Sequence, residues 1–181
     1  CNPSNPCGKV FTRHELEIIA DLAKKYDAYV ITDEVYEHII YEPNRHTYLA
    51  ALPGMRDRTI VCNSLSKTYS ITGWRLGYVI APPEITDRVK KVHDFLTVGA
   101  AAPLMEAAVV GLNFGDDYYK ELQEHYTHMK NLFVGGLKNL GFTFTEPQGA
   151  YYVLMDVSEF GVKDDVEFCE WLAREVGVGA V

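Results

Sequence analysis

Residues 59–80, TIVCNSLSKTYSITGWRLGYVI, place a polar segment between two apolar runs. The runs Thr59–Cys62 and Leu76–Ile80 are short and contain β-branched residues, as buried strands do. Open α/β sheets hold their ligands beside the carboxyl ends of their strands. The segment that follows the first run is therefore a candidate ligand-binding site.

Helices and strands alternate along the first hundred residues. Thr12 and Glu15 have the spacing of a capping box, which predicts a helix running to about Tyr26. A strand is predicted at 29–32 and a helix between Pro83 and Leu96. This alternation predicts an α/β fold with a mainly parallel sheet and flanking helices.

The pattern changes near residue 100. We expect helices at 103–114, 116–140 and 164–175, with Gly141 ending the second, and strands at 151–155 and 178–181. This order predicts a small α+β unit, with domains at 1–105 and 106–181. The chain opens in a turn and stops inside an apolar run, so we expect both domains to be parts of a longer chain.

The composition argues against several classes of function. A net charge of −8 disfavours binding to nucleic acid or to an anionic membrane surface. No apolar run approaches the about 18 residues that a membrane helix needs. The four cysteines lack zinc-site spacing and a C-x-x-C pair, so we expect reduced thiols in a cytoplasmic protein.

Lys67 is the candidate catalytic residue. A lone lysine after a strand is usually a surface residue, but two hydroxyl residues, Ser64 and Ser66, precede this one, and Arg75 follows after a turn. Hydroxyls and a guanidinium are suited to binding a phosphate, and an amine is suited to capturing an aldehyde. Together they favour a phosphorylated aldehyde as the ligand.

Three earlier residues are further candidates. Asp33 ends a predicted strand, where it could cap a helix or hold a pyridine nitrogen protonated. Tyr36 is either a half-buried aromatic or a donor to a phenolic oxygen. The two Asn-Pro steps of residues 2–8 predict a rigid turn, which is either a plain loop or a means of aiming Asn5 at the ligand.

Three motifs together resemble one family. N-P-x-N-P-x-G at 2–8, T-D-E-V-Y at 32–36 and S-x-S-K-x-Y-x-x-x-G-W-R-x-G-Y at 64–78 resemble the fold-type I pyridoxal-phosphate aminotransferases of class I/II. The resemblance continues through 102–107 and 149–152, so it covers essentially the whole chain. Cys7 departs from the family, which usually has Thr at this structural position.

The resemblance implies pyridoxal 5'-phosphate as cofactor, amino acids and 2-oxo acids as substrates, and a homodimer. It implies that Lys67 holds the cofactor as a Schiff base and later moves a proton between the substrate Cα and the cofactor C4′. The other cofactor-binding residues that it implies are Asp33 at the ring nitrogen, Asn5 and Tyr36 at the phenolic oxygen, and Ser64, Arg75 and, more weakly, Ser66 at the phosphate.

Other interpretations stay open. The resemblance places the family's phosphate loop upstream of residue 1 and its substrate-carboxylate arginine downstream of residue 181, so we expect these 181 residues alone to bind the cofactor weakly and to be inactive. A carbon–sulfur β-lyase or a cyclising synthase would use the same Lys67. A non-catalytic module that binds the cofactor is the third possibility. We expect no metal site, because His125 and His128 lack a third ligand.

Overall fold

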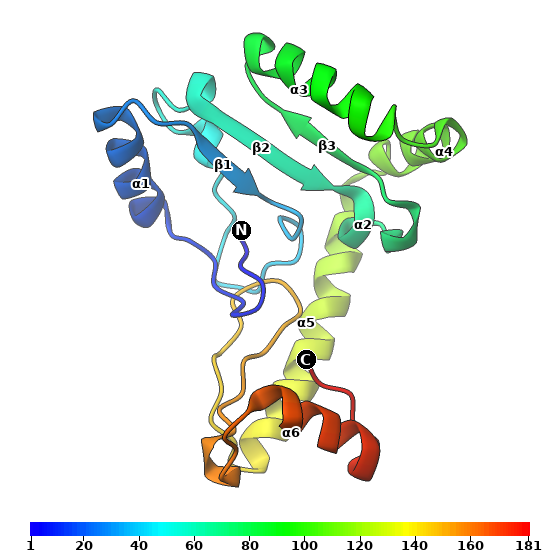
Figure 1. The fold of residues 1–181 in the computed structure, drawn as a ribbon. Coiled ribbons are helices and arrows are strands. Elements are labelled where there is room, and N and C mark those ends of the chain that lie inside the picture. The colour runs from blue at the N-terminus through cyan, green and yellow to red at the C-terminus, as the bar shows by residue number, and fades with distance from the viewer.

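A three-stranded sheet forms one end of the molecule in this computed structural model, which describes residues 1–181 (Figure 1). Its strands are β1 (Val30–Asp33), β2 (Thr59–Ser64) and β3 (Gly77–Ile80), in the order β1-β2-β3. β1 is parallel to β2, whereas β3 is antiparallel to β2 because the chain turns back within residues 65–76. The predicted α/β fold is confirmed, with one parallel and one antiparallel pairing.

Helix α1 (Arg13–Lys25) lies on the β1 side of the sheet (Figure 1). Thr12 is its N-cap, and the Thr12–Glu15 capping box predicted from the sequence is formed. The buried face of α1 packs against the segment between β1 and β2 and forms a hydrophobic core with it. The core residues are Leu16, Ala20, Ala23, Leu49, Leu52 and Met55.

The remaining α-helices begin after β2. They are α2 (Leu65–Thr68), α3 (Pro83–Thr97), α4 (Ala102–Leu112), α5 (Asp116–Asn139) and α6 (Asp165–Trp171), the last continued by a π-helical turn at Leu172–Val176. Gly141 follows α5 with a φ of +78°, a left-handed conformation that favours glycine and ends the helix as predicted. Figure 1 shows α5 running from the sheet to the opposite end of the molecule.

Two predicted strands, 151–155 and 178–181, are wrong. The first region makes one isolated bridge, between Phe144 and Met155, and the second has no strand partner. An apolar run shows that its side chains favour burial, but a strand also needs a neighbouring strand with which its backbone can form hydrogen bonds. Ala150, with a φ of +58°, interrupts the extended backbone at the start of the first run.

Residues 147–152, which we call the docking segment, pack against the N-terminal part of the chain. The amides of Gln148 and Gly149 donate to the carbonyl of Gly8 at 2.8 and 2.9 Å. Ala150 donates to the carbonyl of Ile39 at 2.9 Å, and the Tyr41 hydroxyl donates to the carbonyl of Ala150 at 2.6 Å. In Figure 1 this segment rises beside the N-terminus. The later part of the chain is therefore hydrogen-bonded directly to the N-terminal turn and to the segment that follows β1.

Helix α3 carries an apolar stripe on an exposed face. None of its residues is buried, and Phe95 is 92% exposed, with Val92 and Leu96 beside it also exposed. The helix therefore adds little hydrophobic burial to the fold. None of the helices combines the length and the apolar character that crossing a membrane would require.

Candidate active site

The junction between β2 and α2 places two serine hydroxyls side by side. Ser64 is the N-cap of α2, and its Oγ accepts a hydrogen bond from the amide of Ser66 at 3.1 Å. The Oγ atoms of Ser64 and Ser66 lie 2.6 Å apart. The hydroxyls thus stand at the carboxyl end of β2, where the sequence predicted them.

Arg75 returns to the same strand end. Ser64 pairs with Gly77 in the sheet, and the amide of Leu65 donates to the carbonyl of Leu76 at 3.2 Å. Arg75 adopts a φ of +54°, and its Nη1 donates to the carbonyl of Thr72 at 3.0 Å, leaving the side chain exposed. The chain therefore carries an exposed guanidinium on the segment that leads back to the strand end of Ser64.

Lys67 faces the ring of Tyr151, which together with Tyr152 forms a pair of rings that we call the tyrosine wall. Its half-buried amine lies 5.4 Å from the ring centre of Tyr151, a cation–π distance. Interaction with the Tyr151 hydroxyl, partly opposed by desolvation, raises the pKa of Lys67 above its ordinary value. The amine is therefore held as an ammonium at a defined place rather than extended into solvent.

Tyr36 lies beneath this wall and is only 2% exposed. Its hydroxyl lies 2.9 Å from the hydroxyl of Tyr152, and its ring meets Tyr151 and Tyr152 edge-on. Burial, with smaller effects from Tyr152 and Tyr151, raises the pKa of Tyr36. The phenol therefore keeps its proton at neutral pH and can donate a hydrogen bond.

Asp33 ends β1 with an exposed side chain. Its Oδ1 accepts from the amide of Val35 at 3.2 Å, so it caps the turn after β1 rather than a helix. Asp33 stands opposite Cys62 in the parallel ladder, and burial together with the charge of Asp33 raises the pKa of Cys62. Parallel pairing thus brings the ends of β1 and β2 to one edge.

The N-terminal turn reaches this edge through Asn2. The amide of Asn2 donates to the carbonyl of Asp33 at 2.8 Å, and its Oδ1 accepts from the amide of Phe11 at 3.0 Å. Ser4 and Gly8 close the turn with a backbone hydrogen bond of 2.9 Å. Asn5, the predicted ligand-binding residue, lies exposed on this turn and its side chain makes no hydrogen bond within the chain.

The residues that sequence reasoning missed are Tyr151 and Tyr152. Gly149-Ala150-Tyr151-Tyr152 is part of the family resemblance, but that resemblance gave neither tyrosine a role. In the structure the docking segment brings Tyr151 to Lys67 and Tyr152 to Tyr36. Two adjacent tyrosines after a Gly–Ala step were the available signal.

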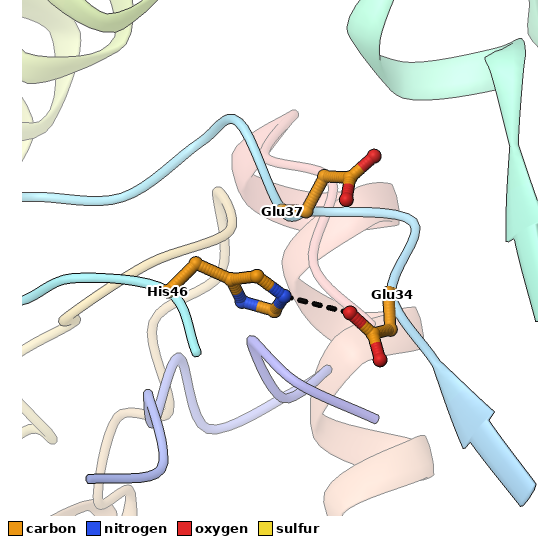
Figure 2. A group of neighbouring side chains, drawn as sticks. All are labelled: Glu34, Glu37 and His46. Carbon is orange, nitrogen blue, oxygen red and sulfur yellow. Dashed lines mark hydrogen bonds and ion pairs between the residues drawn. The ribbon is translucent and has the colours of Figure 1, made fainter. Parts of the chain in front are cut away.

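A second polar cluster, shown in Figure 2, is better described as a buried hydrogen-bonded pair than as a metal site. Glu34 is 1% exposed, and its Oε2 lies 2.7 Å from Nε2 of His46, whose side chain is 7% exposed. Nδ1 of His46 is buried without a partner. Ligation through Nε2 would put the ring proton on Nδ1, where nothing accepts it, whereas histidine ligands normally donate that proton to a neighbour. Nε2 therefore donates to Glu34.

The fold and the groups at its strand ends define a class of protein. The chain belongs to the aminotransferase class I and II family, whose sequence profile matches residues 1–181. Members of this family depend on pyridoxal phosphate.

Individual relatives agree with this assignment. The putative aminotransferase YugH of Bacillus subtilis is 37% identical over 181 residues, which are 100% of this chain and 46% of the relative. The methionine aminotransferase of Escherichia coli is 34% identical and is matched over 99% of this chain and 46% of its own length. The structure of N-succinyldiaminopimelate aminotransferase from Mycobacterium tuberculosis superposes with a TM-score of 0.94 at 34% identity, covering 99% of this chain and 47% of that one. The chain thus spans about half the length of the relatives it matches.

The side chains at this edge fit pyridoxal phosphate in kind. Two hydroxyls and a guanidinium are donors suited to a phosphate. The Lys67 amine suits an aldehyde, a carboxylate such as that of Asp33 suits a ring nitrogen, and a phenol that keeps its proton suits a ring oxygen.

Proposed function

We propose that the whole protein transfers an amino group from an amino acid to a 2-oxo acid, with pyridoxal phosphate held at Lys67. The observation that carries this proposal is the place of Lys67. It follows Ser64 and Ser66 at the end of β2, and its amine faces the Tyr151 ring of the docking segment, in a chain of the aminotransferase family. A solvated surface lysine would have neither set of neighbours.

The cofactor, when bound, supplies an electron sink for the bond that is broken at the substrate Cα. Lys67 has two tasks in this proposal. Its amine first holds the aldehyde, and, once displaced by the substrate amine, it takes the proton from Cα and returns a proton at C4′. Tyr151 supports the second task because its contact with the amine keeps Lys67 within the site.

The remaining residues bind and orient. Ser64, Arg75 and, to a smaller extent, Ser66 hold the phosphate. Asp33 keeps the ring nitrogen protonated, which makes the ring a better electron acceptor. Asn5 and Tyr36 donate hydrogen bonds to the phenolic oxygen, and the raised pKa of Tyr36 ensures that its proton is present.

Replacement of Lys67 by Ala in the whole protein tests this proposal. We expect the rate of amino transfer between an amino acid and a 2-oxo acid to fall by about 10²–10⁴-fold or more. Lys67 both holds the cofactor and acts as the base, and the variant loses both functions. Lys91→Ala, on the exposed face of α3, is the matched control and should keep the wild-type rate. Substantial transfer by the Lys67→Ala protein would contradict the assignment.

The same preparation separates amino transfer from the lyase chemistry that Lys67 could also support. With a sulfur amino acid as substrate, a β-lyase would release pyruvate and ammonia, whereas an aminotransferase requires a 2-oxo acid and forms the corresponding amino acid. We expect turnover to depend on the 2-oxo acid. Release of pyruvate and ammonia without it would contradict amino transfer.

Two further proposals concern the protein's setting. We propose that the whole protein is a homodimer, as its family resemblance implies, which sedimentation analysis would test. We also propose a cytoplasmic location, supported by the four cysteines, all of which are free.

A further inference from the structure

Tyr36 and Tyr152 share a hydrogen bond between two parts of the chain that are 116 residues apart in sequence. The hydroxyls lie 2.9 Å apart, and either could be the donor. Tyr36 is enclosed by the apolar side chains of Ile39 and Ala150. A buried hydroxyl in such surroundings depends on its few polar neighbours for its orientation.

The direction of this hydrogen bond follows from the role of Tyr36, and this step rests on the proposed function. A phenol has a single proton. If Tyr36 donates that proton to the phenolic oxygen of the cofactor, its hydroxyl oxygen is left to accept from Tyr152. Tyr152 then donates to Tyr36, and the two phenols form a chain that ends at the cofactor oxygen.

We propose that Tyr152 is a positioning residue that orients the Tyr36 hydroxyl and strengthens its hydrogen bond to the cofactor. Hydrogen bonds in a chain polarise one another, so a Tyr36 hydroxyl that accepts from Tyr152 is the better donor. Tyr152 itself needs no contact with the cofactor.

The backbone of the docking segment is built to hold Tyr152 in this place. Consecutive side chains of an extended strand point to opposite faces. Here the backbone bends at Ala150 and Tyr151 instead of forming a strand, and Tyr151 and Tyr152 both meet the Tyr36 ring edge-on. Hydrogen bonds from Ala150 to Ile39 and from Tyr41 to Ala150 fix the segment just before the two tyrosines.

The proposal predicts a change in how the cofactor holds its imine proton. The phenolic oxygen attracts that proton, and a hydrogen bond donated by Tyr36 weakens the attraction. Loss of Tyr152 weakens the donation, so the imine becomes more basic. The other titratable groups packed around Tyr36 are Tyr151, Tyr126 of α5 and Tyr41. Lys67 of α2 interacts with Tyr151 and Tyr126. They remain in place in the Tyr152→Phe variant.

The experiment is a pH titration of the visible absorption band of the whole protein loaded with pyridoxal phosphate. We expect Tyr152→Phe to raise the midpoint by about half a pH unit, a roughly threefold change in proton affinity. Tyr119→Phe is the matched control, because it breaks another 2.9 Å bond between two phenols, that of Tyr119 with Tyr69. The control should leave the midpoint unchanged.

A double-mutant cycle excludes a general structural effect. If Tyr152 acts through Tyr36, the Tyr152→Phe shift should vanish in a Tyr36→Phe background. An unchanged midpoint in the single variant, or an equal shift in both backgrounds, would overturn the proposal. Failure of cofactor binding at Lys67 is distinguishable, because the wild-type protein would then show no pH-dependent band that Lys67→Ala removes. Failure of amino transfer alone would leave that band and its dependence on Tyr152 intact.

Discussion

The amine of Lys67 lies 5.4 Å from the ring centre of Tyr151, a residue 84 positions later that the docking segment delivers to it. The Tyr151 hydroxyl raises the pKa of Lys67, so more of the amine is protonated at a given pH than in a free lysine. Only the neutral amine attacks an aldehyde. The contact with Tyr151 that positions Lys67 therefore also slows the attack of the Lys67 amine on the cofactor aldehyde.

Tyr151→Phe should consequently speed the capture of pyridoxal phosphate by protein freed of its cofactor. Loss of the Tyr151 hydroxyl should lower the pKa of Lys67, which leaves more of the amine neutral at a given pH. Stopped-flow absorbance between pH 7 and 9 measures the rate. Tyr26→Phe is the control, because Lys25 lies 5.2 Å from that exposed ring, remote from the proposed site. Equal or slower capture by Tyr151→Phe would show that Tyr151 does not govern the amine.

The Glu34–His46 pair should be important for stability. Removal of His46 would leave the buried carboxyl group of Glu34 without its hydrogen-bond partner, so His46→Phe should lower the free energy of unfolding by about 2–3 kcal/mol. Arg174 and Glu170 form an exposed pair of similar length, 2.8 Å, and Arg174→Ala should cost less than about 1 kcal/mol. Urea denaturation compares the two variants. Equal losses would mean that burial of the Glu34–His46 pair has no energetic consequence.

Gly149 should tolerate no side chain. A Cβ there would lie 2.8 Å from Cγ of Pro3 and 2.9 Å from the carbonyl oxygen of Ile39, so Gly149→Ala should cost about 1–3 kcal/mol and loosen the docking segment. Gly135, within α5, has no heavy atom near an added Cβ, and Gly135→Ala should stabilise by about 1 kcal/mol. Thermal unfolding of both proteins tests the contrast, and a stabilised Gly149→Ala protein would disprove the close packing.

The capping box of α1 should be sensitive to acid. Hydrogen bonding to Lys9, and then to Thr12, lowers the pKa of Glu15 from 4.5 to about 2. Because the folded pKa is depressed, this stabilisation is present above about pH 4.5 and is lost as the pH falls toward 2.

Glu15→Gln should therefore be less stable than wild type at pH 7, and the difference should shrink across that window. Urea denaturation at pH 7, 4 and 2.5 measures it. A difference that stays constant with pH would show that the Glu15 charge is not involved.

The sequence predicted the site edge because the relevant information is local. Capping at Thr12 located α1, and apolar runs located all three strands, so Asp33 and Ser64 were expected at neighbouring strand ends. The tyrosine wall was not predictable in the same way. Its contacts depend on Ala150 leaving the extended conformation and on hydrogen bonds to residues more than a hundred positions away, which no local pattern encodes.

The most direct test of the central claim is to identify the amine that holds the cofactor. The whole protein is loaded with pyridoxal phosphate, reduced with borohydride so that the cofactor is fixed to that amine, digested and analysed by mass spectrometry. The proposed site predicts that the label is on Lys67. A label on any other lysine, with Lys67 unmodified, would contradict the account.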